Sequence, residues 1–158
     1  MQGQHKYNLI TKWSGNTGKG TSDYRSYNRN HIISIENKPD LLCSSDPSFR
    51  GDHTKYNPEE LLVAALSGCH MLSYLHQCAI SGVIVLEYSD NASGTMEQTP
   101  DGGGHFTEVT LFPHVVVSDA SMTEKANELH HTASKLCFIA NSCNFPVYHK
   151  PTCVVKDA

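Results

Sequence analysis

Apolar and polar residues alternate in short stretches over the first third of the chain. Residues 5–14 follow a period of two, which predicts a first strand. Residues 21–35 show a similar spacing of Tyr and Ile and predict two more short strands, with a bend at 28–30. Residues 39–56 are rich in Pro, Ser, Asp and Gly and predict a loop. The N-terminal third is therefore expected to be mostly antiparallel β-structure.

The pattern changes to a helical period at Asn57. Asn57 is a good N-cap, Pro58 suits the first helical position, and two glutamates follow at the positive end of the helix dipole. Apolar residues then cover much of the helix circumference as far as the expected stop at Gly82. The sequence therefore predicts a long, central and buried helix with Cys69 in its middle.

The second half of the chain predicts a hairpin and a further helix. Residues 83–96 and 106–117 are rich in β-branched and aromatic residues and flank a glycine-rich turn, which predicts a long hairpin. Ser121 and Glu124 predict a capping box at the start of a second apolar-faced helix. This helix is expected to reach residue 140 and to carry Cys137 near its C-terminal end.

A last strand is predicted over residues 145–155. Strands, helix, hairpin, helix and strand in this order indicate an α+β fold rather than a doubly wound parallel sheet. With 158 residues, of which 39% are hydrophobic, the chain is expected to form one domain, residues 1–158. The sequence contains no apolar run long enough to span a membrane, and residues 1–10 lack the pattern of a secretory signal. We therefore expect a cytoplasmic protein without a membrane partner.

Charge and cysteine content narrow the chemistry. The net charge is −4 and the basic residues are scattered, so nucleic acid is not an expected partner. The six cysteines are expected to be reduced, catalytic or metal-binding, because no export signal is recognisable. His76 and Cys78 point to different faces of the predicted helix, so no metal site is expected. A serine hydrolase is not favoured either, since the GxSxG motif is absent.

Cys69 has two interpretations from the residue pattern alone. A cysteine among Leu, Val and Ala side chains is more often a small core residue than a reactive group. Ser67 and Gly68 leave little bulk around its sulfur, however, and Cys137 can reach it if the two helices pack together. Cys143 is the alternative partner because it follows Cys137 closely in the sequence. Packing and chemistry both stay open at this stage.

A thiol in apolar surroundings ionises more readily beside a cation, and arginine keeps its charge where lysine can lose it. Arg50 is the first candidate because its loop leads directly into the helix, and Arg29 is the second. Glu59 precedes Cys69 by about 15 Å along the helix axis, which is too far for contact. If both residues serve one site, Glu59 comes from a second copy of the chain, and a symmetric dimer forms the site.

Three segments resemble a known family. Residues 57–70, NPEELLVAALSGCH, look like the first cysteine helix of the OsmC/Ohr superfamily, the osmotically inducible protein C and organic hydroperoxide resistance proteins. Residues 13–21, WSGNTGKGT, are similar to the N-terminal strand and turn of this family. Residues 136–142, LCFIANS, lie where the family keeps its second cysteine. The chain is thus identified as an OsmC-like member of this superfamily.

The resemblance implies a fold and an activity. Members form intertwined homodimers in which antiparallel sheets wrap long central helices, and they are thiol peroxidases that reduce organic hydroperoxides in oxidative-stress defence. Carried over by position, Cys69 becomes the peroxidatic thiolate and Cys137 the resolving thiol. Glu59 matches the catalytic glutamate of the family, and Arg50 matches its arginine most nearly, with Arg29 as the alternative.

The resemblance implies no bound cofactor. In the Ohr branch, dihydrolipoamide or lipoylated proteins supply the electrons, so an external dithiol is the expected reductant. Phe138 follows Cys137 where the family often has Pro, and His70 stands where Ohr proteins commonly have Phe, which indicates a divergent subgroup. Two other functions remain open: a non-catalytic binding or structural protein that kept the fold, and a thiol or metal sensor.

Overall fold

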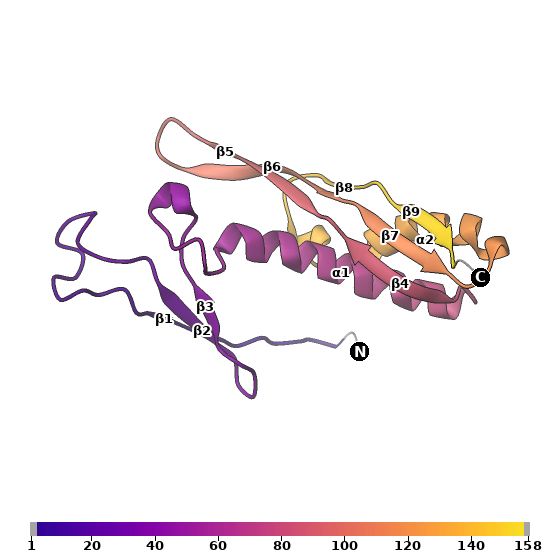
Figure 1. Ribbon diagram of the computed structural model, residues 1–158, viewed down its shortest axis with the longest axis horizontal. Coiled ribbons are helices and arrows are strands. Elements are labelled where there is room, and N and C mark those ends of the chain that lie inside the picture. Colours follow the sequence, from indigo (N-terminus) through magenta and orange to yellow (C-terminus); the bar gives the residue numbers. More distant parts are fainter. Residues whose placement is uncertain (1–2, 157–158) are drawn as a thin grey trace. The chain divides into compact units, whose positions relative to one another are not determined.

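The computed structural model describes residues 3–156, and its contacts divide the chain into two compact units, up to residue 61 and from residue 62 onward. Figure 1 shows the first unit in indigo and purple and the second in magenta to yellow. Helices and mostly antiparallel strands together form an α+β fold, as the sequence predicts. The expectation of one domain over residues 1–158 stays a prediction.

The first unit contains a three-stranded antiparallel sheet in the order β1-β2-β3. Its strands are β1 (Ile10–Trp13), β2 (His31–Ser34) and β3 (Leu41–Cys43). Two predictions are wrong here: residues 21–35 hold one strand instead of two, and β3 lies within the predicted loop. Residues 18–26 form turns and bends instead, with the Asn16 side chain accepting hydrogen bonds from the backbone of Gly18 and Gly20.

Helix α1 (Pro58–Ile80) begins and ends where the sequence predicts. Asn57 and Glu60 form a reciprocal cap: the Glu60 backbone N–H donates to Asn57 Oδ1 at 2.8 Å, and the Asn57 N–H donates to Glu60 Oε2 at 3.2 Å. Gly82 follows the helix with φ of 74°, a left-handed conformation that glycine adopts without strain.

The predicted long hairpin is confirmed, but it is divided between two sheets. Its strands are β4 (Val85–Asp90), β5 (Ser93–Gln98), β6 (Gly104–Leu111) and β7 (Pro113–Val117). The outer part pairs β5 with β6 and the inner part pairs β4 with β7, both antiparallel. At the division, Asp90 Oδ1 accepts a hydrogen bond from the backbone N–H of Phe112 at 2.7 Å. One carboxylate therefore joins the two arms where the hairpin changes sheet.

The C-terminal segment supplies one strand to each of these sheets. β8 (Val147–His149) pairs parallel to β6, and β9 (Thr152–Val155) pairs parallel to β7. The prediction of a single last strand is therefore wrong. Pro151 separates the two strands, since proline has no N–H to donate to a sheet.

Helix α2 (Thr123–Leu136) is shorter than predicted at both ends. The predicted Ser121–Glu124 capping box is wrong: Ser121 contacts Asp119, which caps the preceding 3-10 helix Ala120–Met122. Cys137 leaves the helix with φ of −71° and ψ of 107°. The Asn141 side chain donates to the Lys135 carbonyl at 3.0 Å and satisfies one of the free acceptors at the helix end. Cys137 is therefore the first residue after α2 and not part of it.

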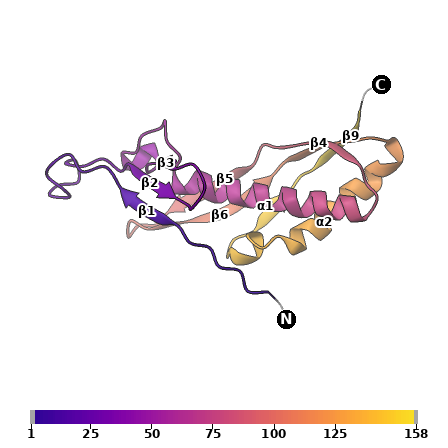
Figure 2. The ribbon, with the colours of Figure 1, turned by 90° about the horizontal axis from the view of Figure 1, so that it is seen from below.

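One part of the core of the second unit lies between the two helices and the sheet that contains β7. Side chains from α1, α2 and β7 form one buried cluster whose members include Tyr74, Val115 and Leu129. Figures 1 and 2 show α1 along the strands, and Figure 2 shows α2 beside it. The opposite side of α1 is open, with Leu72 and Ile80 each 66% exposed. The expectation of a helix buried on most sides is therefore wrong for a single chain. Within residues 3–156, neither helix is long and apolar enough to cross a membrane.

Candidate functional site

The second unit brings the two predicted thiols together. Cys69 lies in the middle of α1, and Cys137 directly follows α2. Cys137 is 1% exposed, and this burial is the main cause that raises the pKa of its thiol. The neighbouring side chain of Cys69 raises that pKa further. Both cysteines are free thiols, so the arrangement is that of two neighbouring reduced thiols.

The two thiols differ in access. Cys69 is half-buried and lines a cavity of about 710 Å³, whereas Cys137 is buried. The other lining residues come from α1 and from the two neighbours of Cys137: Ala65, Gly68, Leu72, Ser73, His76, Gln77, Leu136 and Phe138. Most of these are apolar, with polar groups from Ser73, His76 and Gln77. A substrate in this cavity would therefore meet the sulfur of Cys69 and not that of Cys137.

Gly68 keeps the cavity open next to Cys69. Outside its own helix turn and chain neighbours, a Cβ atom added at Gly68 would have no neighbour within 4 Å among the described residues. Gly68→Ala is therefore expected to stabilise α1 by about 0.5–1 kcal/mol, since alanine loses less backbone entropy than glycine. Gly68→Leu is expected to slow the labelling of Cys69 by N-phenylmaleimide about 10-fold, because a side chain would occupy the approach to the sulfur.

The control for this prediction is Ala64→Leu, which enlarges an exposed residue of the same helix outside the cavity lining. Labelling by N-phenylmaleimide is measured residue by residue with peptide mass spectrometry, and iodoacetamide serves as the smaller reagent for comparison. Equal labelling of Cys69 in Gly68→Leu and Ala64→Leu would show that the cavity is not the route to the sulfur.

A cluster of histidines lies beside the thiol pair and was missed in the sequence analysis. His70 Nε2 and His130 Nδ1 are 3.0 Å apart, which makes a hydrogen bond between α1 and α2. The ring of Tyr74 stacks on His130 with centroids 3.8 Å apart, and the ring of His149 lies 4.3 Å from that of His70. His70 and His130 are 0% and 3% exposed. The signal was the helical spacing of His70 with Leu66 and Tyr74, which marks the buried stripe of α1.

These histidines are held neutral. Burial lowers the pKa of His70 to about 3 and that of His130 to about 4, because the charged form is poorly solvated. The pKa of His149 is lowered too, again through burial, although Asp90 opposes the shift. His70 Nδ1 and His130 Nε2 are buried and have no hydrogen-bond partner among residues 3–156. An unpaired buried polar atom costs about 1–3 kcal/mol, so the cluster is not an arrangement that maximises stability.

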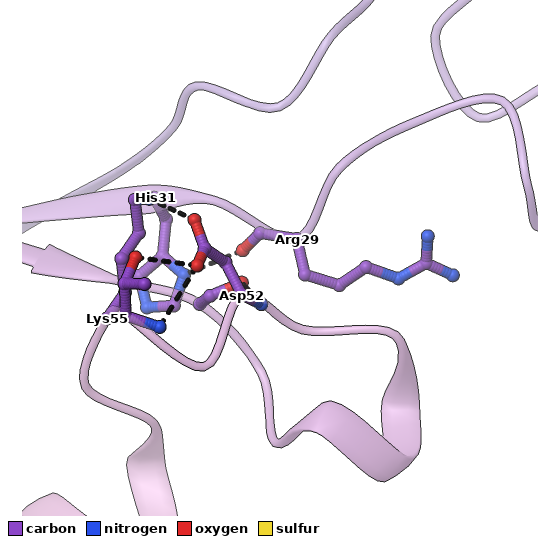
Figure 3. Close-up of polar contacts among 6 residues, drawn as sticks. Arg29, His31, Asp52 and Lys55 are labelled. Atoms are coloured by element: carbon purple, nitrogen blue, oxygen red, sulfur yellow. Dashed lines mark hydrogen bonds and ion pairs between the residues drawn. The ribbon is translucent and has the colours of Figure 1, made fainter.

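The predicted arginines and glutamate belong to the first unit. Arg29 donates to the carbonyls of Tyr24 and Tyr27, both at 2.7 Å, and its guanidinium lies 4.2 Å from the centre of each of their rings. Figure 3 shows this side chain pointing away from Asp52 and Lys55, which form an ion pair with each other. Arg29 is therefore fixed by its own loop.

Arg50 is exposed and has a left-handed backbone, with φ of 67°, at the end of the 3-10 helix Pro47–Phe49. Glu59 lies in the first turn of α1, and its Oε2 is buried without a hydrogen-bond partner in the described part of the chain. A buried carboxylate oxygen of this kind can accept a charge-assisted hydrogen bond from a guanidinium. The action of Arg50, Arg29 or Glu59 on Cys69 stays a prediction.

The four other cysteines are also free thiols. Cys143, the alternative partner of Cys137, donates to the carbonyl of Ile139 with Sγ and O 3.3 Å apart. Among residues 3–156, no three His, Cys, Asp or Glu side chains are grouped so that they could hold a metal ion.

Comparison with known proteins assigns the chain to a family. The family described as OsmC-like protein matches residues 51–150, which include both thiols of the pair. The chain belongs to the OsmC-like protein family. Among curated proteins, no sequence matches this OsmC-like chain.

Solved structures with a similar fold cover almost the whole chain. An OsmC-like protein of unknown function from Vibrio cholerae is 31% identical, with a TM-score of 0.85 over 94% of this chain and 100% of its own. An organic hydroperoxide resistance protein from Elizabethkingia anophelis is 16% identical, with a TM-score of 0.68 over 99% of this chain and 100% of its own. A Legionella pneumophila protein described as an organic hydroperoxide resistance protein OsmC and predicted redox protein is 18% identical, with a TM-score of 0.64 over 96% and 100%. The last two show that the fold is shared.

Proposed function

We propose that this OsmC-like protein is a thiol-dependent peroxidase that reduces organic hydroperoxides to alcohols. The observation that carries the proposal is that Cys69 and Cys137 are neighbours at an apolar cavity whose lining includes Cys69 and not Cys137. Family membership supports a redox role, since similar folds are described as organic hydroperoxide resistance proteins. Oxidative-stress defence is the corresponding cellular role.

In the first step, the thiolate of Cys69 attacks the terminal oxygen of the hydroperoxide. The O–O bond breaks, the alkoxide takes a proton and leaves as an alcohol, and Cys69 becomes a sulfenic acid. The apolar lining of the cavity favours an alkyl group over water, so organic hydroperoxides are expected to react faster than hydrogen peroxide. Cys137 is poorly placed for this step because it is buried and its pKa is raised.

In the second step, the sulfur of Cys137 attacks the sulfenic sulfur of Cys69. A Cys69–Cys137 disulfide forms and the hydroxyl leaves as water after taking the thiol proton, so atoms and charge balance. The disulfide must then be reduced by an external dithiol, for which dihydrolipoamide or a lipoylated protein is our proposal. No bound cofactor is needed for either step.

We propose that an arginine completes the site by stabilising the thiolate and polarising the peroxide. Arg50 is the first choice and Arg29 the second, as Tyr24 and Tyr27 already bind the Arg29 guanidinium. Glu59 would orient the guanidinium and would come from the partner copy of a homodimer. The exposed Leu72 and Ile80 on the open side of α1 support such a dimer.

A single-turnover experiment tests the proposal. Reduced protein is mixed with one equivalent of cumene hydroperoxide, and peptide mass spectrometry then maps the oxidised cysteines. We expect one equivalent of peroxide to be consumed for each Cys69–Cys137 disulfide formed, with a slower reaction for hydrogen peroxide. The absorbance of the thiolate at different pH values in Arg50→Leu and Arg29→Leu decides which arginine acts.

Two results would contradict the proposal. The peroxide could remain unconsumed by the fully reduced protein, which would favour a non-catalytic protein with this fold. Alternatively, oxidation could spread over Cys43, Cys78, Cys143 and Cys153 as readily as over the Cys69–Cys137 pair, which is the behaviour of unspecific thiols.

A further inference from the structure

Polar side chains bring α1 close to α2 and to Cys137 at three places. Tyr74 OH donates to the carbonyl of Ala126 at 3.1 Å, His70 bonds to His130 at 3.0 Å, and the side chain of Cys69 neighbours the thiol of Cys137. From the first contact to the third, the residue numbers decrease along α1 and increase toward the end of α2. The helices therefore run antiparallel. We call these contacts the inter-helix ladder: Tyr74–Ala126, His70–His130 and Cys69–Cys137.

The histidine contact is the neighbour of the thiol contact in this ladder. His70 follows Cys69 directly in α1, and His130 lies about two helical turns before Cys137. The apolar residues that pack nearby, such as Ala126, Leu129 and Ala133, set no direction as strictly as a hydrogen bond does. The histidine contact is thus well placed to fix how far α2 reaches along α1.

The hydrogen bond between the two histidines is better explained by selection of one helix packing than by a gain in stability. Both imidazoles are buried, and the bond between them leaves His70 Nδ1 and His130 Nε2 without partners in the part of the chain that the structure describes. Either tautomer leaves one donor and one acceptor unpaired, since each neutral ring has one N–H and one free nitrogen. Two apolar side chains would avoid that loss. A buried polar pair that lowers stability is explained when it selects one packing among several.

We propose that His70 and His130 are positioning residues, whose hydrogen bond holds Cys137 within bonding distance of Cys69 for disulfide formation. Neither histidine takes part in bond making. The step they assist is the condensation of Cys69 sulfenic acid with the Cys137 thiol, which yields the disulfide and water. This inference rests on the proposed function for its biological use, but the positioning itself can be measured without any peroxide.

The test measures the effective concentration of Cys137 at Cys69 through the equilibrium of their disulfide with reduced and oxidised glutathione. His130→Leu removes the hydrogen bond, whereas His130→Asn keeps a polar atom at the position of Nδ1. We expect the effective concentration to fall at least about 10-fold in His130→Leu and to recover largely in His130→Asn. The labelling of Cys69 by iodoacetamide is expected to stay unchanged in both, because its access is through the cavity.

His131→Leu is the matched control, since His131 is the exposed neighbour of His130 on the same helix. The proposal is overturned if His130→Leu is folded and keeps the effective concentration of the wild type. It is also overturned if His130→Asn is no better than His130→Leu, because the loss would then reflect packing alone.

If His130→Leu does not fold, the comparison is made at the other end of the bond. His70→Gln can reach the position of Nε2, and His70→Asn is too short to do so. Equal effective concentrations in these two variants would overturn the proposal. A protein that forms the disulfide in a histidine-dependent way but consumes no hydroperoxide would refute the proposed function and leave this inference standing.

Discussion

Replacing Cys69 with serine is expected to abolish hydroperoxide reduction, with kcat/KM lower by at least about 1,000-fold. Serine keeps the size of the side chain, but its hydroxyl is far less acidic and less nucleophilic than a thiol. The cavity next to Cys69 stays intact in this variant, so any loss is chemical. Cumene hydroperoxide consumption with excess dithiol, followed by stopped flow, measures the effect.

Substitutions of the two thiols are expected to block the reaction at different steps. Cys137→Ser should retain the first oxidation, and the sulfenic acid on Cys69 should accumulate and react with dimedone. Steady-state turnover should then stop, because the disulfide cannot form. Cys153→Ser is the control, since Cys153 is half-buried like Cys69 but lies in β9. Turnover in Cys69→Ser would rule out the mechanism. Full turnover in Cys137→Ser would rule out the resolving role of Cys137.

The second large effect is a loss of stability in mild acid. His70 and His130 have pKa values of about 3 and 4 in the folded protein, lowered by burial from an ordinary value of 6.5. Below pH 6.5 the unfolded chain therefore binds protons that the folded chain does not, and unfolding becomes more favourable as the pH falls. The stabilisation by neutral histidines is complete above pH 6.5 and is lost progressively below it.

The size of this effect follows from the two buried rings. Each contributes about 1.4 kcal/mol per pH unit below its unfolded pKa, so the pair lowers the free energy of unfolding by about 4 kcal/mol at pH 5. His149, also with a lowered pKa, acts in the same direction. The aspartates with lowered pKa values, such as Asp46 and Asp119, lose their contribution only below about pH 4.

Urea unfolding followed by circular dichroism at 222 nm measures the effect, because that signal reports mainly on α1 and α2. His130→Asn removes one titrating ring and should reduce the pH dependence by about half. His131→Gln changes an exposed histidine and should leave it as in the wild type. A free energy of unfolding that is constant between pH 7 and pH 5 would contradict the neutral, buried state of His70 and His130.

Local signals in the sequence predicted the elements that depend on short-range chemistry. The cap of α1 is one example, since Asn57 and Glu60 need only each other and the first turn to form it. The stop at Gly82 is another, because it depends on the left-handed freedom of one glycine. The hairpin over residues 83–117 was recognisable for the same reason, from β-branched runs around a glycine-rich turn. The α+β class and the family followed from these elements and from the cysteine helix.

Errors arose where a distant segment decided the local conformation. The pattern of residues 145–155 predicts one strand, but the structure has two, one in each of two sheets. The segment divides because the hairpin with which it pairs changes sheet at Asp90. The second helix was predicted to be longer than it is, because its apolar spacing continues past Leu136. In the structure, the Asn141 side chain donates to the Lys135 carbonyl at the end of the helix. The expected burial of α1 on most sides took no account of where its packing partners lie.

The sequence by itself determined the α+β order of elements, the cysteine helix from Asn57 and the two thiols that the chemistry requires, because periodicity, caps and residue types are local properties. Only the tertiary structure decided that Cys69 faces a cavity while Cys137 is buried against it. It also decided that His70 and His130, which are 60 residues apart, form one hydrogen bond in the core. Contacts between residues so distant in the chain depend on how α1, α2 and the sheets pack, and no local pattern encodes that packing.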